Sequence, residues 1–129
     1  MTTDDIPEEV KKFIHAHITS IEQLEVLLFL VHHTERVWDA VSVSRELYIH
    51  PESTANRLAD LQNRGFILAD GESTPQYQYR AATPAQHQTI TSLAQLYKER
   101  WFTIIDLIFA KPSDTIQSFA DAFRIRKEK

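Results

Sequence analysis

The stretch that decides the fold is HPESTANRLADLQNRGFI, residues 50–67. A proline is favoured in the first turn of a helix, and the residue before it is disfavoured in one, so a helix is expected to begin at Pro51. Gly65 predicts a left-handed stop, after which residues 66–69 have the pattern of a short strand. Three apolar residues at helical spacing predict the buried side of this helix: Ala55, Leu58 and Leu61.

The residues downstream predict a β-hairpin and then helices. Asp70-Gly71 indicates a turn, and residues 76–80 alternate as a return strand with Tyr77 and Tyr79 on one face. From Thr83-Pro84 a long helix is expected to run to about Lys111-Pro112. Ser113 is the expected cap of a final short helix whose apolar face holds Ile116, Phe119, Ala120 and Phe123.

The residues upstream predict three helices and a very short strand. Ser20 and Gln23 match a capping box at the start of a helix over 20–31. Val37-Trp38 is the expected strand, and Asp39 is the expected cap of a helix over 40–48. Before these, Asp5 as a cap with Pro7 just inside predicts an N-terminal helix that ends near Ile18.

This order of elements is that of a winged helix-turn-helix. The predicted fold class is mostly α (α+β), with a short β-hairpin wing, an N-terminal helix and long C-terminal helices. The expected parts are a helical arm over 1–19, the winged helix-turn-helix core over 20–83, and the C-terminal helices with a basic tail over 84–129.

The flanking helices resemble those of dimeric bacterial winged-helix regulators of MarR or PadR type. The runs FIHAHITSIEQLEVLLFL and FADAFRIRK are also similar to a family of small bacterial winged-helix proteins. The resemblance covers nearly the whole chain and implies the fold and the role of a regulator, without a substrate. One departure is His50 in the cap position before Pro51, where Ser or Thr is more usual.

Composition narrows the class of protein. The chain of 129 residues fits one domain, and its net charge of −4 argues mildly against non-specific nucleic-acid binding. Cysteine is absent, which excludes disulfides and thiolate metal sites. The acidic start, MTTDDIPEEV, is unlike a secretory signal, and the longest apolar run, WFTIIDLIFA, is about half the ~20 residues of a membrane span. We therefore expect a cytoplasmic protein that does not bind a membrane.

The helix over 51–64 is the expected DNA-reading element. Asn pairs with adenine and Arg with guanine in the major groove, so Asn56 and Arg57 are the candidate base readers. Ser53 and Arg64 are candidates for phosphate contacts, and Arg80 for a flanking contact from the wing.

The charge of this region leaves a second interpretation open. Residues 42–82 hold four arginines, five carboxylates and no lysine, a balance of −1, and the expected wing tip is acidic. So few cations predict weak phosphate neutralisation. DNA binding and a role as a protein-binding adaptor without DNA therefore remain alternatives of similar weight.

The expected long C-terminal helix predicts a homodimer. Its second half, residues 101–110, is apolar nearly all round and must be covered on every side. A second copy of the chain is the simplest cover; the alternative is that the helices over 6–18 and 113–123 fold back over it. The predicted interface comprises Ile90, Leu93, Tyr97, Trp101, Ile104, Ile105 and Ile108.

Two further groups of aromatic residues are candidate binding surfaces. The stripe of Phe119 and Phe123, followed by a basic tail, can dock on the body as a latch or serve as a protein-binding or DNA-contacting tail. Tyr97, Trp101 and Phe102 can line an effector pocket, although such aromatics are more often core or interface.

No enzymatic activity, metal or cofactor is expected. The chain has only two glycines, which excludes a Gly-rich phosphate loop, and no two histidines stand four residues apart on a helix.

Overall fold

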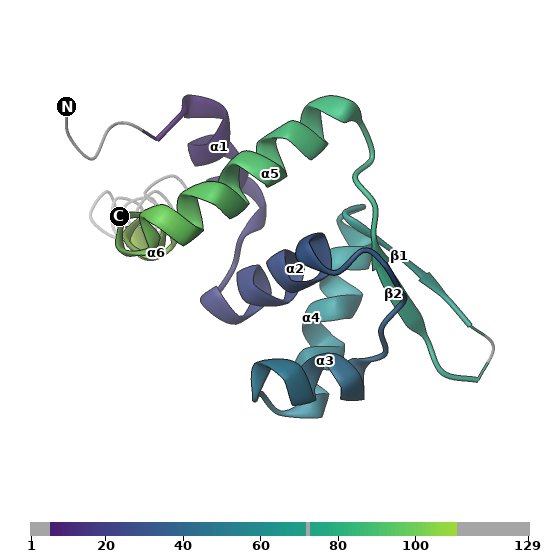
Figure 1. Cartoon of the computed structure of the whole chain (residues 1–129). Coiled ribbons are helices and arrows are strands. Elements are labelled where there is room, and N and C mark those ends of the chain that lie inside the picture. Colours follow the sequence, from purple (N-terminus) through teal and green to yellow (C-terminus); the bar gives the residue numbers. More distant parts are fainter. Residues whose placement is uncertain (1–5, 72, 111–129) are drawn as a thin grey trace, which may run out of the picture.

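The computed structural model describes residues 6–71 and 73–110. Along this part of the chain the elements follow the predicted order: α1 (Glu8–His17), α2 (Ile21–His32), α3 (Ala40–Leu47), α4 (Pro51–Asn63), β1 (Ile67–Asp70), β2 (Gln76–Tyr79), α5 (Pro84–Glu99) and α6 (Trp101–Ala110). The predicted class, mostly α with a β-hairpin wing, is confirmed. Helix α2 lies between two groups of elements: α1, α5 and α6 on one side, and α3, α4 and the hairpin on the other (Figure 1).

Local capping explains where the helices begin. The Ser20 hydroxyl accepts a hydrogen bond from the Gln23 backbone N–H at 3.0 Å, and the Asp39 carboxylate accepts one from the Ser42 N–H at 2.8 Å. His50 caps α4 as expected from its place before Pro51, because its Nδ1 accepts from the Glu52 N–H at 3.0 Å. These three helix starts are confirmed.

The N-terminal helix begins differently from the prediction. The predicted cap, Asp5, lies outside the described residues, and the residue in the cap position is Pro7, which makes no side-chain cap hydrogen bond. Two backbone N–H groups of the first turn, those of Val10 and Lys11, instead donate to the Pro7 carbonyl at 3.0 and 3.1 Å.

The hairpin is antiparallel and is extended by a third short segment. Ile67 pairs with Tyr79 and Asp70 with Gln76. Trp38 forms an isolated bridge with Tyr77 through two backbone hydrogen bonds of 2.8 and 2.7 Å. The predicted strand at Val37-Trp38 is therefore present as this bridge at Trp38, which attaches the α2–α3 connection to β2 of the wing.

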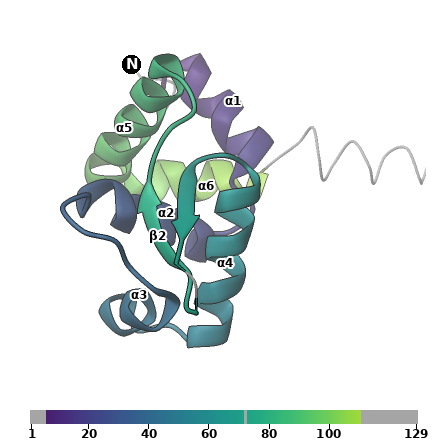
Figure 2. The same cartoon turned by 90° about the vertical axis from the view of Figure 1, so that its right-hand side faces the viewer.

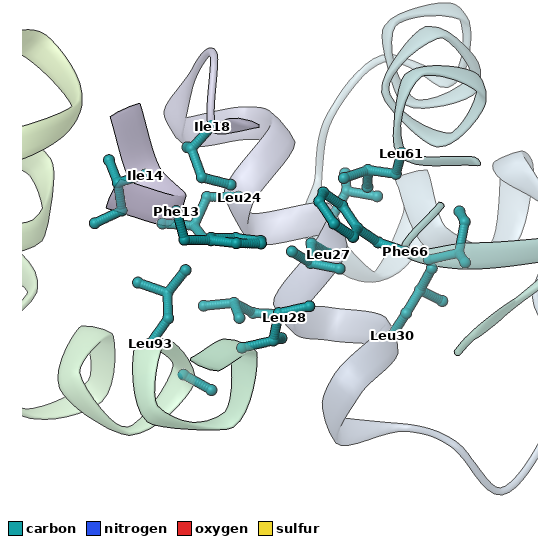
Figure 3. Packing of buried hydrophobic residues seen from close by; sticks show 14 of the residues in the cluster. Phe13, Ile14, Ile18, Leu24, Leu27, Leu28, Leu30, Leu61, Phe66 and Leu93 are labelled. Carbon is teal, nitrogen blue, oxygen red and sulfur yellow. The ribbon is translucent and has the colours of Figure 1, made fainter. Parts of the chain in front are cut away.

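The core forms where α1, α2, α4 and α5 meet (Figure 3). The rings of Phe13 from α1 and Phe66 from the start of the wing lie 5.1 Å apart, above Leu27 of α2. On α4, Leu58 and Leu61 are buried as predicted. The third fully buried residue of this helix is Thr54, and the predicted Ala55 is only half-buried.

The predicted long C-terminal helix is in fact two helices. Arg100 leaves the helical conformation with φ −138° and ψ 51°, so α5 ends at Glu99 and α6 begins at Trp101. Helix α6 is seen end-on in Figure 1 and lengthwise in Figure 2, whereas α5 runs across the view of Figure 1. The break turns α6 back against α1, and the two helices are in contact.

Candidate nucleic-acid interface

Helix α4 has three distinct sides. Its core side carries Thr54, Leu58 and Leu61. A second side, which faces α1 and α2, carries Ser53, Arg57, Asp60 and Arg64. The third side is exposed to solvent and carries Glu52, Asn56, Ala59 and Asn63, which we call the outer stripe. The last two sets share the spacing i, i+4, i+7, i+11, which keeps each set on one face of a helix.

Two of the predicted DNA-contacting side chains, Arg57 and Ser53, are hydrogen-bonded to the carboxylate of Glu22 on α2. The Arg57 Nε donates to Glu22 Oε1 at 2.8 Å, and the Ser53 hydroxyl donates to the same oxygen. These hydrogen bonds, that from Ser53 first, hold the pKa of Glu22 below its ordinary value. Both members of the ion pair are about one-third exposed, at 35% and 28%, so the pair is accessible to solvent and to ions.

Arg64, the C-cap residue of α4, is held in a similar way. The Arg64 Nε donates to Asp60 Oδ2 at 3.0 Å, and one of its terminal nitrogens lies 3.4 Å from the Ala16 carbonyl of α1. Asp60 Oδ2 also accepts from the side-chain amide of Gln23 at 2.7 Å. The guanidinium of Arg64 therefore lies toward α1, away from the outer stripe.

The residues on and beside α4 that were predicted to contact DNA, Ser53, Asn56, Arg57 and Arg64, do not lie on one side of the helix. Ser53, Arg57, Asp60 and Arg64 are half-buried and bonded to α1, α2 or each other. Among the predicted DNA-contacting residues of α4, Asn56 alone lies on the outer stripe. Within that stripe, Glu52 is the one charged residue, so the exposed side of the helix presents amides, a methyl group and a carboxylate.

Arg80 lies at the base of the wing rather than at its tip. Its backbone N–H donates to the Phe66 carbonyl at 2.9 Å, one residue beyond the Ile67–Tyr79 pair that ends the ladder. At about 3.3 Å per residue, the described tip residues 73–75 are roughly 15 Å or more along the strand from Arg80. The side chain is exposed, but it cannot accompany the tip into a groove.

The wing turn depends on Gly71. Its φ is +112°, and a Cβ added there would collide with the backbone carbonyl oxygen of Thr74. Asp70 supports the turn by accepting from the Gly71 N–H at 2.7 Å. The Asp70 carboxylate contributes to the acidic charge predicted for this end of the wing, and it also stabilises the turn.

A further exposed residue was missed by the sequence pattern. Tyr48 ends α3 in the left-handed conformation, with φ 59° and ψ 42°, and its side chain is 93% exposed. Glycine is the usual residue in such a position. Tyrosine does not favour positive φ, so the residue type at position 48 gives no indication of this conformation, which is seen only in the structure.

A small apolar hollow separates the wing from the helix-turn-helix. Its volume is about 130 Å³, and Ala55 is the residue of α4 that lines it. The residues that line it are Asp39, Ala40, Val41, Ala55, Thr74, Pro75 and Tyr77.

The predicted dimer residues divide into two groups. Ile90, Leu93, Ile104 and Ile108 are buried by this chain itself, so they serve its own core. Trp101 is 50% exposed, and Tyr97 and Ile105 are partly exposed. The most exposed aromatics of α6 are Phe102 and Phe109, at 68% and 73%, and neither was in the predicted set. The rings of Trp101 and Phe102 stack with centroids 4.3 Å apart.

Helix α1 covers the inner side of α6, as expected if the chain's own flanking helices fold back over it. The other covering segment, 113–123, with its Phe119 and Phe123 stripe, lies outside the described residues.

Tyr97, a candidate for an effector pocket, instead joins two helices. Its hydroxyl donates to the Glu25 carboxylate of α2 at 3.0 Å. Burial, this hydrogen bond and the charge of Glu25 raise the pKa of Tyr97 to about 12. The phenol therefore remains a neutral donor at physiological pH, and Glu25 has a partly buried partner that the sequence pattern did not predict.

Residues 6–71 and 73–110 contain neither a cluster of metal-binding side chains nor a single helix that could span a membrane. No group of three His, Cys, Asp or Glu side chains in this part of the chain could hold a metal ion. No single helix among these residues is long and apolar enough to cross a membrane. Helices α1 and α2 reach that length and composition only as a pair bent by 117°.

The fold is that of known winged-helix transcription regulators. MepR, a transcription regulator of the Staphylococcus aureus multidrug efflux pump MepA, superposes with a TM-score of 0.54 at 12% identity, over 94% of this chain and 87% of that chain. A MepR–DNA complex gives a TM-score of 0.54 at 12% identity, over 94% and 89%. A ZitR mutant of Lactococcus lactis in apo form gives 0.50 at 16% identity, over 86% and 85%.

At these identities the likeness establishes the fold alone. The sequence matches no known protein-family profile, and no curated protein sequence is similar enough to count as a relative.

Proposed function

We propose that the protein is a DNA-binding transcription regulator that acts as a homodimer. The observation that carries this proposal is the outer stripe of α4, an exposed helix face at the second helix of a helix-turn-helix, flanked by a β-hairpin wing. A helix in this position enters the major groove in proteins of this architecture. The fold shared with the MepR–DNA complex supports the same arrangement.

The chemistry of the contact follows from the three sides of α4. Asn56 is the base reader, because it is exposed and an amide pairs with the edge of adenine. Arg80 contacts the phosphate backbone at the edge of the site, since it is exposed but distant from the wing tip. Arg57 and Ser53 reach phosphate only after leaving Glu22, so their contribution depends on competition between phosphate and that carboxylate.

The homodimer forms through α6. Trp101, Phe102 and Phe109 give this short helix an exposed aromatic surface. Contiguous exposed apolar surface of this kind marks an interface. A two-fold pair of chains would present two copies of α4, which a palindromic operator requires about one helical turn apart.

Light scattering coupled to size exclusion tests the dimer. The expected result is a dimer mass for the protein and a monomer mass for a variant with Phe102→Glu and Phe109→Glu. Leu68→Glu is the matched control, because Leu68 is also an exposed apolar residue but lies on the wing. A monomer mass for the unmodified protein at micromolar concentration contradicts the dimer.

Fluorescence anisotropy with genomic DNA fragments across a salt series tests DNA binding. The expected result is binding at low salt that weakens as salt rises, with a shallow slope because few phosphates are neutralised. Asn56→Ala is expected to weaken binding to the tightest fragment, while Gln88→Ala, an exposed amide on α5, leaves it unchanged. Absence of binding at low salt contradicts the proposed function.

One observation favours a second candidate, a protein-binding adaptor without DNA binding. The outer stripe carries one carboxylate and no cation, a charge that suits a protein surface better than a phosphate backbone. The adaptor is supported if DNA binding is absent at low salt and a purified partner protein binds with an affinity that Asn56→Arg lowers. Salt-dependent DNA binding that Asn56→Ala weakens excludes the adaptor role for the outer stripe.

A further inference from the structure

The side chains of the outer stripe offer a restricted set of contacts to base edges. Asn56 and Asn63 each present an amide, which can accept from the adenine N6 amino group and donate to N7. Ala59 lies between them and presents a methyl group, the kind of contact that the thymine methyl receives. Glu52 offers only acceptors, which suit the amino groups of adenine or cytosine and not the two acceptors of guanine.

The kinds of side chain that read guanine, arginine and lysine, are absent from the outer stripe. Guanine is recognised most often by a bidentate arginine or lysine. Helix α4 contains one arginine, Arg57, and no lysine, and a second arginine, Arg64, is its C-cap residue. Arg57 is bonded to Glu22 at 2.8 Å and Arg64 to Asp60 at 3.0 Å, both on the side of α4 that faces α1 and α2. No cation of α4 therefore extends from its outer stripe.

The spacing of the two amides fits successive positions along a groove. Asn56 and Asn63 stand two turns apart, which corresponds to a rise of about 10.5 Å at 1.5 Å per residue. Base pairs are stacked about 3.4 Å apart. A helix that lies along the groove therefore brings the two amides to base pairs about three apart, with Ala59 over the step between them.

We infer that the outer stripe of α4 reads adenine–thymine base pairs, with Asn56 and Asn63 on adenines about three base pairs apart and Ala59 against a thymine methyl. This inference rests on the DNA-binding function proposed above and names the class of sequence that the same face selects. Guanine is disfavoured at both amide positions because the arginines that would read it are held by Glu22 and Asp60.

Selection from a pool of duplexes with a randomised centre, retained on the full-length protein at low salt and then sequenced, tests the inference. The expected result is enrichment of adenine–thymine pairs at two positions about three base pairs apart in each half-site. Asn56→Ala removes the preference at one of these positions, and exchanging that pair for guanine–cytosine lowers the affinity of the unmodified protein by about 5- to 150-fold. Gln88→Ala on α5 is the matched control and retains both preferences.

The outcomes separate the inference from the function on which it rests. Retention of the pool without adenine–thymine enrichment, or with guanine at the amide positions, overturns the inference and leaves DNA binding in place. An identical profile for Asn56→Ala and Gln88→Ala also overturns it. No retention of any duplex at low salt overturns the proposed function itself. Asn56 is exposed and alanine favours helices, so Asn56→Ala is expected to fold, which circular dichroism verifies.

Discussion

The guanidinium of Arg57 lies 2.8 Å from the carboxylate of Glu22, which joins the middle of α4 to the first turn of α2. The same carboxylate oxygen accepts the hydroxyl of Ser53. An oxygen anion held by an arginine and a serine has the same partners that a DNA phosphate would take. Glu22 thus competes with phosphate for these two side chains, and removing its charge should make them available to DNA.

Glu22→Gln is expected to strengthen DNA binding, because Arg57 loses its ionic partner and becomes free to neutralise a phosphate. The measurement is anisotropy against salt concentration, and the slope of log K against log salt should steepen by about one. Glu25→Gln is the control: it removes the same charge from the next turn of α2, but the hydroxyl that Glu25 accepts from belongs to Tyr97 of α5. Equal effects of the two variants would show that only net charge matters.

Asp39→Ala is expected to lower the free energy of unfolding by about 1 kcal/mol at pH 7, because α3 loses its cap. Hydrogen bonds from Ser42 hold the pKa of Asp39 below its ordinary value of 3.8. A carboxyl group whose pKa is lowered by folding stabilises the protein above 3.8, and this contribution is lost as pH falls through the folded-state pKa. The difference between the two proteins should therefore shrink in denaturant titrations at progressively lower pH.

The matched variant for this cap is Asp39→Asn. An amide oxygen still accepts from the Ser42 N–H, so most of the stability at pH 7 is retained. Because the amide does not titrate, its contribution should persist at low pH. An Asp39→Ala penalty that stays constant from pH 7 to below the folded-state pKa would contradict the assignment.

Tyr48→Gly is expected to stabilise the protein by about 0.5–1 kcal/mol. The left-handed conformation costs a residue with a Cβ about 1–2 kcal/mol, and the greater freedom of glycine in the unfolded chain offsets part of the gain. Little packing is lost, since the side chain is almost fully exposed. Thermal unfolding measures the effect as a rise of a few degrees in Tm. Tyr48→Ala keeps the Cβ and should give no comparable rise; equal gains from both variants would refute the strain argument.

Gly71→Ala is expected to destabilise the wing more than Gly65→Ala destabilises the end of α4. Both glycines have positive φ, at +112° and +88°, so both variants carry the conformational penalty of about 1–2 kcal/mol. Only at Gly71 does the added Cβ also meet backbone, the carbonyl of Thr74. Hydrogen exchange of the β1 and β2 amides should report the difference. Equal exchange in the two variants would contradict it.

The order of elements was predictable because the residues that delimit them act locally. Ser20, Asp39 and His50 each accept a hydrogen bond from an N–H two or three residues ahead, which is a property of the nearby sequence alone. Gly65 and Gly71 supply positive φ where the chain must turn. Such signals need no knowledge of the rest of the molecule.

The sides of α4 were harder to predict. Apolar spacing identifies the core side of a helix, but it does not tell which flank a neighbouring helix will cover. Arg57 and Asn56 are adjacent in sequence, and only the position of Glu22 on α2 separates the held residue from the exposed one. The residues assigned to DNA contact therefore mixed two sides of one helix.

The usual sequence signals of a helix end are absent at Arg100, where α5 gives way to α6. Neither proline nor glycine stands there, and the apolar spacing continues from Leu93 through Tyr97 to Ile104. The break follows from long-range packing, since α6 buries Ile104 and Ile108 while lying against α1. Similarly, nothing near Tyr48 in the sequence indicates its left-handed conformation.

The side chain of Gln23 is fully buried, and its amide nitrogen donates both to the His17 carbonyl of α1 at 3.1 Å and to the Asp60 carboxylate of α4 at 2.7 Å. Its oxygen accepts from the Thr19 N–H, a shifted form of the capping box expected at Ser20. The side-chain amide of Gln23 therefore connects three helices, α1, α2 and α4. A tilt of α1 must therefore either carry α4 with it or break the hydrogen bonds of the buried Gln23 side chain. A movement of α1, which packs against α6, is therefore coupled through Gln23 to α4, the helix that carries the outer stripe.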